Sequence, residues 1–561
     1  MTLNDVIITN VLKFARNTGK NASDLISNYS ASQLKYAGYT DVFVLAADSL
    51  SAEAGGLSLN VDVLIPSVYG FMVGSNNIID IIVTQVLTFA YNTGVSGYQL
   101  KTAGYADSQL ISAGYTDSEI NRPTAEQMRL DGYSIYDLQE AGYSNFEILR
   151  AGYSASDLQG AGFTATELEN AGYSVVDLIN AGYTWSMLGQ TISGEQGGDN
   201  TGNSVSMSSD SSIIAVGSFL NSDNGLQSGN VKMYQYVDGS WNQLGQTIFG
   251  EPGDRVGSSV SLSSNGTIVA ICANNSSNIN ENAGIVKIFE YVDGSWNQLG
   301  QSILGENIGV YAGSSVSLSS NGNSVIISNI TRTIDSERHG NIRTFLYANG
   351  SWNQYGQSIV QGLGGESVAM SSDGNYIVFG SFETINGQVR AFNYADGSWN
   401  QLGETILGEN GDLAGCSVSM SSDGTIISVG AYGNNNYAGK VRIFQYVTGS
   451  WNQYGQSLYG DKAGDWGGYS TALSSDGQTV CIGHIQNTTV NQQYYDGYVR
   501  LFKYYNGVWY QIGSDILSII HVNNSDGTGS SVALSSDGNT VIIGAENANG
   551  TRGYAQVYTL N

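Results

Sequence analysis

The phrase Gly-Ser-Trp-Asn-Gln-Leu-Gly-Gln recurs with small changes through the last two thirds of the chain. Its Trp residue returns about every 54 residues, at Trp185, Trp241, Trp296, Trp352, Trp399, Trp451 and Trp509. A spacing of this size is typical of repeat architectures, in which each module buries an apolar face against the next one. Seven such modules are therefore expected to form an array or a closed ring.

Each module contains four short segments separated by turn residues. An alternating segment such as SVALSSD at 531–537 is followed by an apolar segment such as TVIIGA at 540–545. After a loop come a second alternating segment, such as GKVRIFQY at 439–446, and the Trp phrase. Alternation bounded by Asp-Gly or Asn-Gly predicts antiparallel strands, here named A, B, C and D. Four strands in each of seven modules predict a seven-bladed β-propeller.

The two ends of the repeat array complement each other. The chain enters the array on a lone D strand at 184–192 and finishes on a lone C strand at 553–561. These segments are the halves of one C–D hairpin without its turn. Pairing of 184–192 with 553–561 would close the ring and leave no open edge between the first and last blades. The predicted propeller domain is 184–561.

A second repeat, ten residues long, occupies 101–183 and follows the pattern AGY[ST]xx[DE]L. In the copy at 151–160, Ser154 is placed as a helix N-cap and Asp157 as its capping-box partner. Gly162 falls where a left-handed residue ends a helix. Because such short helices are unstable alone, their apolar faces are expected to stack into an α-solenoid. The chain is therefore predicted to be multidomain, with a short-helix solenoid followed by an all-β propeller.

The first hundred residues, 1–100, contain a duplication. The stretch VLKFARNTGKNASDL at 11–25 matches VLTFAYNTGVSGYQL at 86–100, and both are helix-like. Residues 42–75 fit neither pattern and are left open between strands and an irregular connector. We predict a duplicated helical domain over 1–100 with a connector at 42–75.

The propeller module resembles the FG-GAP repeat of integrin α-chain-type propellers. The resemblance is carried by GSSVALSSDGNTVIIGAENANGTRGYAQVY at 529–558 and implies a β-propeller fold. The calcium loop of that family is rich in alternating Asp, whereas this chain has SSDG or SSNG, and SSDS at 208–211. The resemblance therefore gives no support for calcium at this turn. We expect no cofactor and no bound metal.

Composition excludes several classes of partner. Asp and Glu number 48 against 21 Lys and Arg, and the formal net charge of −27 repels nucleic acid and anionic membranes. The apolar stretch around 57–90 is interrupted by charged residues and Pro, so no membrane span is expected. The N-terminus has no basic residue before its apolar stretch, which makes a secretory signal doubtful.

Catalytic patterns are sparse. His339, His484 and His521 occur in non-equivalent contexts, so they assemble no Ser/His/Asp or metal-ligand set. We predict that the protein is not an enzyme. The alternative, a propeller-type glycosidase or lyase, would require two carboxylates or a His set that converge on the central channel from non-repeated positions.

Basic residues recur at one position of the C strand, and acids follow the D strand. Structural ion pairs are predicted between the two sets. The basic set is Lys232, Lys287, Arg343, Arg390, Arg442 and Arg500, and the acidic set is Glu195, Glu251, Glu306, Glu409 and Asp461. The alternative is a ring of cations that grips an anionic ligand.

Strand order assigns the loops to two faces. B–C loops and D–A crossovers share one face, and the near-identical A–B and C–D turns share the other, where the helical array is expected to attach. The B–C loops differ in every blade, which is typical of recognition on a rigid scaffold, although drift in unconstrained loops is the alternative. The candidate binding residues in these loops are Asn224, Asn278, the arginine that follows Glu337 (Arg338), His339, Tyr432, Tyr437, Tyr494 and Tyr495.

The predicted function is recognition or adhesion without catalysis. The propeller head would bind a protein or glycan ligand, and the helical region would anchor the protein or bind other structural proteins. By analogy with repeat proteins of this composition, we expect an extracellular surface or a virion. The alternatives are a purely structural particle component and the propeller-type glycosidase or lyase.

Overall fold

The structure is a computed structural model that describes most of the chain in two compact units, divided between Ser154 and Ala155. The described residues are 87–88, 91, 97–102, 104–275, 284–305, 310–332, 338–361, 365–382, 386–486, 497–518 and 526–561. Most of the predicted 1–100 domain, including the connector at 42–75, lies outside them.

Each decapeptide of the second repeat forms one helix of five to seven residues. In the first unit these are α7 (Gly97–Thr102), α8 (Asp107–Ser112), α9 (Asp117–Asn121), α10 (Ala125–Leu130), α11 (Ile135–Glu140) and α12 (Asn145–Arg150). In the second unit they are α13 (Ala155–Gly160), α14 (Ala165–Asn170) and α15 (Val175–Ala181).

Helix α14 shows why the decapeptide starts and stops a helix so abruptly. The Thr164 hydroxyl accepts a hydrogen bond from the Glu167 amide, and the Glu167 carboxylate accepts one from the Thr164 amide at 2.8 Å. After the helix, Gly172 turns the chain with φ of +95°. This reciprocal pair of bonds satisfies two amide groups that the start of a helix leaves without partners. The predicted capping pattern is confirmed.

Each decapeptide packs on the decapeptide two repeats before it in the sequence. The hydroxyl of Tyr143 donates to the carbonyl of Pro123 at 2.5 Å, and in the second unit Tyr183 donates to Phe163 at 2.7 Å. Both bonds join residues twenty positions apart. Within the units, α10 contacts α12 and α13 contacts α15. One turn of the solenoid therefore contains two decapeptides, a pairing that the ten-residue period does not reveal.

The remaining chain forms seven antiparallel sheets, each with the A-B-C-D order that the sequence predicts. The blades are numbered by their A strands. The A strands are β3 (Thr201–Met207), β8 (Val256–Leu262), β13 (Val310–Leu318), β18 (Ser367–Met370), β23 (Val418–Met420), β28 (Gly467–Leu473) and β33 (Thr528–Leu534). The B strands are β4 (Ile213–Ser218), β9 (Ile268–Ala273), β14 (Ser324–Arg332), β19 (Tyr376–Ser381), β24 (Ile426–Ala431), β29 (Thr479–His484) and β34 (Thr540–Ala545). The C strands are β5 (Asn230–Val237), β10 (Ile285–Val292), β15 (Arg338–Ala348), β20 (Gln388–Ala395), β25 (Lys440–Val447), β30 (Tyr498–Tyr505) and β35 (Tyr554–Leu560).

The predicted D strand is interrupted, which corrects the sequence analysis. Its first part contains the Trp, its second part pairs separately with the C strand, and a glycine lies between them. At Gly245 φ is +73°, and a Cβ atom there would lie 2.8 Å from the ring of Trp296. The first parts are β1 (Trp185–Met187), β6 (Ser240–Gln243), β11 (Ser295–Gln298), β16 (Ser351–Gln354), β21 (Ser398–Gln401), β26 (Ser450–Gln453) and β31 (Val508–Gln511). The second parts are β2 (Ile192–Ser193), β7 (Ile248–Phe249), β12 (Ile303–Leu304), β17 (Ile359–Gln361), β22 (Ile406–Leu407), β27 (Leu458–Tyr459) and β32 (Ile516–Leu517).

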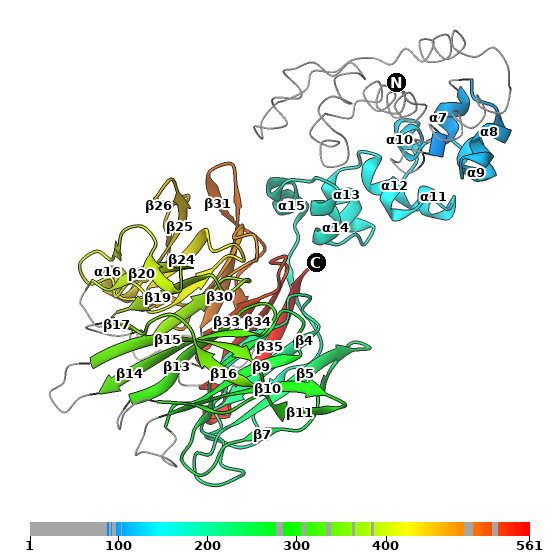
Figure 1. The fold of residues 1–561 in the computed structure, drawn as a ribbon. Helices are drawn as coiled ribbons and strands as arrows, with labels where there is room; N and C mark the ends of the chain where they lie inside the picture. Colours follow the sequence, from blue (N-terminus) through cyan, green and yellow to red (C-terminus); the bar gives the residue numbers. More distant parts are fainter. Residues whose placement is uncertain are drawn as a thin grey trace. The chain divides into compact units, whose positions relative to one another are not determined.

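The ring closes as predicted, by pairing of the first and last strands. Trp185 of β1 lies opposite Leu560 of β35, and Ile192 of β2 lies opposite Ala555. Figure 1 shows β35, in red, beside β34 of blade 7. The seven-bladed β-propeller and its closing hairpin are therefore confirmed.

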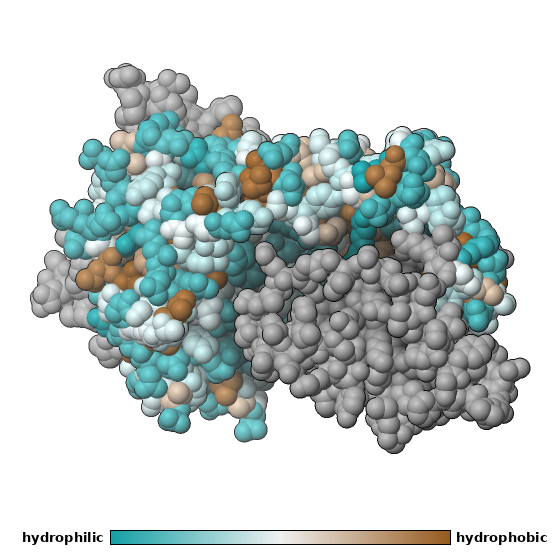
Figure 2. Space-filling view, turned by 90° about the horizontal axis from the view of Figure 1, so that it is seen from above, coloured by the Kyte–Doolittle hydropathy of each residue, from teal (hydrophilic) through white to brown (hydrophobic). Residues whose placement is uncertain are grey.

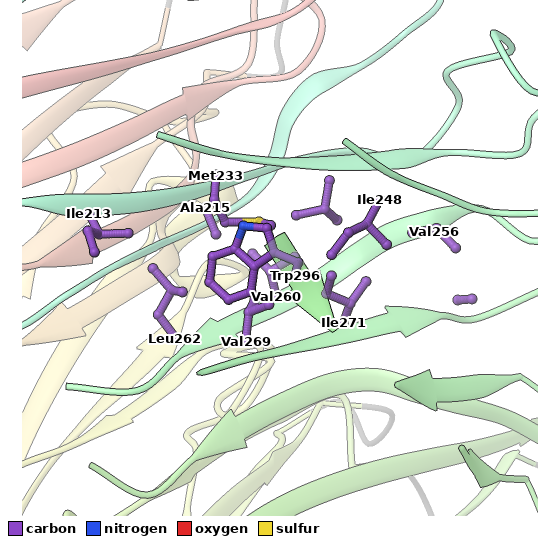
Figure 3. Close-up of a cluster of buried hydrophobic side chains, with 12 residues drawn as sticks. Ile213, Ala215, Met233, Ile248, Val256, Val260, Leu262, Val269, Ile271 and Trp296 are labelled. Atoms are coloured by element: carbon purple, nitrogen blue, oxygen red, sulfur yellow. The ribbon is translucent and has the colours of Figure 1, made fainter. Parts of the chain in front are cut away.

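The repeated Trp connects each blade to the one before it. In blade 2, the Trp296 ring lies among aliphatic side chains of blades 1 and 2, including Ala215 and Val260 (Figure 3). Its indole nitrogen donates to the Leu244 carbonyl at 2.8 Å. The side chain of Gln246 bonds both the amide and the carbonyl of Trp296, at 2.9 and 2.7 Å. The constant phrase is thus a latch between blades, built from apolar burial and three hydrogen bonds.

The last helices join the propeller at its A–B turns, the face that the sequence analysis predicted. Asn539 of the A–B turn in blade 7 donates to Thr166 at 2.9 Å and to Glu169 at 3.0 Å. Lys503, at the end of β30, pairs with Glu169. These contacts explain why the compact unit begins at Ala155, earlier than the predicted boundary at 184. No helix in the described part of the chain has the length and apolar character needed to span a membrane.

Candidate recognition site on the variable-loop face

Two of the predicted ion pairs are present. Lys232 pairs with Glu195, and Arg500 pairs with Asp461, with one guanidinium nitrogen 2.8 Å from a carboxylate oxygen. The hydrogen bonds from Arg500 lower the pKa of Asp461. Arg500 also bonds Asp515 at 2.8 Å. These pairs connect a D–A crossover to the C strand of the next blade, as the sequence analysis proposed.

Other predicted pairs are not formed. The prediction of a pair between Arg442 and Glu409 is wrong, because Glu409 contacts Lys440 at 3.2 Å and Arg442 donates to the Leu407 carbonyl at 2.9 Å. Residues two apart in a strand point to the same side, so either cation can reach the acid. The structure shows no ion pair between Lys287 and Glu251, although it describes both.

The two remaining predicted cations are Arg343 and Arg390. Arg343 donates to the Leu304 carbonyl at 2.7 Å, and its predicted partner Glu306 lies outside the described residues. No ion pair of Arg390 occurs among the described residues. All six cations lie on C strands, the third strands from the axis, so they do not converge on an axial anion.

A set of buried aspartates in the D–A crossovers was missed by the sequence analysis. They are Asp199, Asp254, Asp412, Asp465 and Asp526, none more than 4% exposed. Asp412 accepts a bond from the Glu409 amide at 2.9 Å and so closes the crossover turn. The signal was present in the sequence, because four of the five follow an acid of the Gly-Glu or Gly-Asp type by three or four residues.

The first residue of the C strand provides the second partner of three of these aspartates. Lys440 contacts Asp412 at 2.8 Å, and the Tyr498 hydroxyl donates to Asp465 at 3.0 Å. Tyr554 bonds Asp526 at 3.2 Å. Burial raises the pKa of Asp412, but the bonds from Lys440, Asn434 and the backbone outweigh it, and the pKa lies below its ordinary value. These groups hold the crossovers in place.

The candidate binding residues divide into four groups. Asn224 donates to the Gly250 carbonyl at 2.8 Å and so stabilises its own loop. Arg338 and His339 begin β15, but their side chains are outside the described part. Three candidates fall outside the described residues altogether, namely Asn278, Tyr494 and Tyr495. The remaining two are tyrosines of one B–C loop.

These two, Tyr432 and Tyr437, form a stack with Trp466. The ring centroids of Tyr432 and Trp466 are 4.7 Å apart at an interplanar angle of 15°, and those of Tyr437 and Trp466 are 5.5 Å apart at 24°. The two tyrosine rings are 6.2 Å apart at 26°. The three rings are therefore nearly parallel and mutually offset, an arrangement that aromatic pairs prefer.

Two further aromatic rings border this stack. The ring centroid of Phe382, after β19, lies 5.9 Å from that of Tyr432, and the ring centroid of Tyr469 in β28 lies 6.1 Å from that of Trp466. We call these five residues the aromatic cluster. Tyr432 and Tyr437 come from the B–C loop of blade 5, and Trp466 comes from the D–A crossover that follows it. Phe382 begins the B–C loop of blade 4 and Tyr469 lies near the start of β28, so all five are at the variable-loop face. Tyr437 is 45% exposed, so the cluster reaches solvent.

Trp466 is the one Trp of eight outside the repeated phrase. Its backbone is left-handed, with φ of +54°, a conformation that costs free energy for any residue but Gly. The equivalent crossover positions have Asn200, Arg255, Leu413 and Gly527, all with positive φ. The backbone thus accepts many side chains here, and the indole of Trp466 is a property of this crossover alone.

Beside the cluster lies Glu546, at the end of β34. Burial raises the pKa of this carboxyl. Burial, and next the Glu546 carboxylate, raise the pKa of Tyr469 to about 12. Glu546 is the one acid at this position of the seven blades, where the others have Phe, Asn, Ile or Tyr, and a non-repeated position is what an active-site carboxylate would require.

His484 is a core residue. It is 2% exposed and stacks on Tyr498 with ring centroids 4.3 Å apart. Burial and then Arg500 lower its pKa to about 3, so the imidazole is neutral at physiological pH. No group of three or more His, Cys, Asp or Glu residues suited to a metal ion occurs among the described residues.

The opposite end of the axis is closed by a ring of serines. All seven blades line a cavity of about 140 Å³ there. Around it, the amide of one serine donates to the carbonyl of its neighbour in the next blade, for example from Ser209 to Ser264 at 2.8 Å. The complete ring is Ser209, Ser264, Ser320, Ser372, Ser422, Ser475 and Ser536. Each ring amide and carbonyl is therefore used in joining the blades.

The described surface has few large apolar features. On the face drawn in Figure 2, hydrophobic residues form separate spots among hydrophilic ones. The most exposed aliphatic side chains of the propeller are Leu226, Leu407 and Leu517, which lie in three different blades. Scattered residues of this kind are ordinary on soluble proteins. The aromatic cluster differs because its rings contact one another.

Comparison with known proteins supports the decapeptide repeat. The family model of the decapeptide repeat region matches residues 122–191. A search of curated protein sequences finds no match. The resemblance to the FG-GAP repeat stays a prediction.

Among solved structures, the chain is similar to several propellers at low identity. For the hydrazine synthase of Kuenenia stuttgartiensis, identity is 14% with a TM-score of 0.44, over 66% of this chain and 98% of that one. For the periplasmic gluconolactonase of Pseudomonas aeruginosa, identity is 15% with a TM-score of 0.42, over 60% of this chain and 90% of that one. For a chain of a mitotic checkpoint complex, identity is 14% with a TM-score of 0.42, over 66% of this chain and 95% of that one.

Proposed function

We propose that this protein is a non-enzymatic recognition protein whose propeller binds a ligand through the variable-loop face. The observation that carries the proposal is the aromatic cluster. The seven Trp residues of the repeated phrase serve the blade latches, whereas Trp466, Tyr432 and Tyr437 meet on loops that differ from blade to blade. Exposed aromatic side chains with few flexible torsions are the residues that recognition surfaces favour.

The support for the cluster is rigid, which favours binding without an ordering cost. The B–C loop that bears Tyr437 bonds the buried Asp412 through Asn434, at 2.7 Å. Asp412 in turn is held by Lys440. On the other side, the Trp466 amide donates to the Tyr437 carbonyl at 2.8 Å. A ligand would therefore meet a preformed surface.

In this proposal the ligand is a protein or a glycan, and the protein acts at an extracellular surface or on a virion. The helices of the decapeptide repeat would serve anchoring or assembly with structural proteins. Attachment of α14 at the A–B turns favours this division, because it leaves the B–C loops of the propeller open to a ligand.

The proposal is tested with the full chain on a glycan array and in pull-downs against surface proteins. The variant Trp466→Gly removes the indole and should keep the fold, because the equivalent crossover position of blade 7 is Gly527 with the same left-handed backbone. We expect it to lose ligand binding. Arg255→Gly, at the equivalent position of the crossover that bonds the B–C loop of blade 1, is the control and should bind normally. Equal binding by all three proteins, or none by the parent, would refute the proposal.

A propeller-type hydrolase or lyase is the second candidate, and Glu546 is the observation that favours it. A carboxyl group with a raised pKa beside an aromatic surface is a candidate general acid. The discriminating measurement is release of reducing sugar from any glycan that binds. Product formation that Glu546→Gln abolishes would favour the enzyme, and binding without product would favour recognition.

A further inference from the structure

We infer that the aromatic cluster is a binding site for a neutral saccharide, whose ring stacks on Tyr437 and Trp466. This inference rests on the proposed function and names the ligand class of the same site. It depends on three features of the described residues: an internal comparison between two loops, the geometry of the rings, and the charge around them.

The internal comparison involves two loops with the same backbone. In blade 5 the B–C loop contains α16 (Asn434–Tyr437), and in blade 7 it contains α17 (Ala548–Thr551). Both contain three consecutive residues with positive φ, namely Asn435, Asn436 and Tyr437 in one loop and Asn549, Gly550 and Thr551 in the other.

Each of these loops is bonded in the same way to the adjacent D–A crossover. The Tyr437 carbonyl accepts bonds from Trp466 at 2.8 Å and Gly464 at 3.0 Å. The Thr551 carbonyl accepts bonds from Asn200 at 2.9 Å and Gly198 at 3.2 Å. Blade 7 therefore makes the same turn with Thr and Asn where blade 5 has Tyr and Trp.

It follows that the backbone does not require the aromatic pair. Thr551 and Asn200 show that small polar side chains satisfy this turn. The left-handed Trp466 costs more than Gly or Asn would at the same position. Arg255 and Leu413 adopt the same conformation at the equivalent positions, so what distinguishes Trp466 is its stack with Tyr432 and Tyr437, part of which is exposed.

The ring geometry selects the ligand class. The three rings stack on one another at interplanar angles of 15° to 26°, and the stack reaches solvent at Tyr437, which is 45% exposed. An ammonium group would instead need rings that face inward as a cage. The negative ring faces suit the weakly positive C–H groups on the flat side of a pyranose. The exposed side chains of Asn435 and Asn436, next to Tyr437, offer both donors and acceptors for sugar hydroxyls.

Net charge selects against anionic sugars. Asp461 and Glu409, in the crossovers on either side of the cluster, are paired with Arg500 and Lys440, whereas the chain as a whole has a net charge of −27. A sialylated, uronate or sulfated glycan would be repelled. The structure therefore favours hexoses and N-acetylhexosamines.

The test uses the full chain and a panel of neutral oligosaccharides, with sialylated and sulfated glycans and choline as competing classes. We expect one or more neutral oligosaccharides to bind, as followed by calorimetry. The variant Tyr437→Thr/Trp466→Asn copies the loop of blade 7, so the turn should still form and the protein should still unfold cooperatively, while that binding weakens at least tenfold. Tyr437→Phe keeps the ring and should bind within about twofold of the parent.

The outcomes separate this inference from the proposed function. If the full chain binds a protein target through this face but no neutral oligosaccharide, the recognition function stands and the saccharide inference fails. Preference for sialylated glycans or choline also overturns the inference, as does unchanged binding by the double variant. If nothing binds at all, both proposals fail.

Discussion

At the scale of single residues, the buried Lys440–Asp412 pair is the clearest case of a charge that the fold must compensate. Both side chains are almost completely buried and contact at 2.8 Å. The cost of removing two ions from water is repaid only while both partners remain. Glu409 adds a third charge at the surface end of Lys440.

Replacing Lys440 with Met should lower the free energy of unfolding by about 3 to 5 kcal/mol, because Asp412 would stay buried without its cation. Arg442→Met, two residues along the same strand, removes an exposed cation and should cost less than about 1 kcal/mol. Urea denaturation of the full chain measures both. The double variant Lys440→Met/Asp412→Asn should recover part of the loss, and the idea fails if it is no more stable than Lys440→Met.

The pH dependence of stability should contain a component from His484. Its pKa is about 3 in the fold, against 6.5 ordinarily, so below pH 6.5 the unfolded chain takes up a proton that the folded chain refuses. Stability should therefore fall as the pH drops from about 6.5 towards 3. His484→Phe keeps a ring stacked on Tyr498 and removes this component. Denaturant midpoints between pH 7 and 4 should decline less steeply in the variant, in which Arg500 stays charged and the neighbouring Asp461 and Asp515 are retained.

At the scale of elements, the blade latch is the unit that repeats. In five blades a Gln between the two parts of the D strand bonds the amide and the carbonyl of the next Trp, for example Gln301 with Trp352 at 2.9 and 2.7 Å, and a sixth has Ser514 at this position. In one blade the Gln is replaced by Glu404, which accepts from the Trp451 amide at 3.3 Å. A carboxylate has no N–H group, so it cannot donate to the Trp451 carbonyl.

Glu404→Gln should accordingly stabilise the protein, because it restores the missing donor. One additional hydrogen bond is worth about 1 kcal/mol. Gln301→Glu, the reverse change in another blade, should destabilise by a similar amount. Thermal unfolding of the two variants and the parent gives the comparison. If Glu404→Gln melts below the parent, the latch does not depend on the second hydrogen bond.

The sequence predicts elements well where one short period determines them. Period-2 alternation and Asp-Gly turns define the blades, and the capping residues define the short helices. It predicts poorly what depends on contacts between distant segments. The aromatic cluster joins Tyr432 and Tyr437 to Trp466, which lies in another segment, and the stacking of alternate decapeptides depends on bonds across twenty residues. The wrong partner for Glu409 has the same origin, because the buried Asp412 that attracts Lys440 is recognised as buried only in the fold.

At the scale of the whole molecule, the ring depends on one hairpin made from two ends of the propeller sequence. The backbones of Thr184 and Asn561 exchange two hydrogen bonds of 2.9 Å, next to the pairing of β1 with β35. Strand β35 also pairs with β34 and β2. Loss of this one strand would leave three strands with open edges.

Deletion of residues 553–561 should therefore abolish the single cooperative unfolding transition of the propeller, and the open edges should make the protein aggregate. Deletion of Asn561 alone removes two backbone bonds and should lower the melting temperature by only a few degrees. A synthetic peptide of residues 553–561, added during refolding of the truncated chain, should restore a soluble monomer. Size-exclusion chromatography and calorimetry would follow the recovery. A truncated chain that melts cooperatively at the parent temperature without the peptide would show that closure by β35 is not what holds the seven blades together.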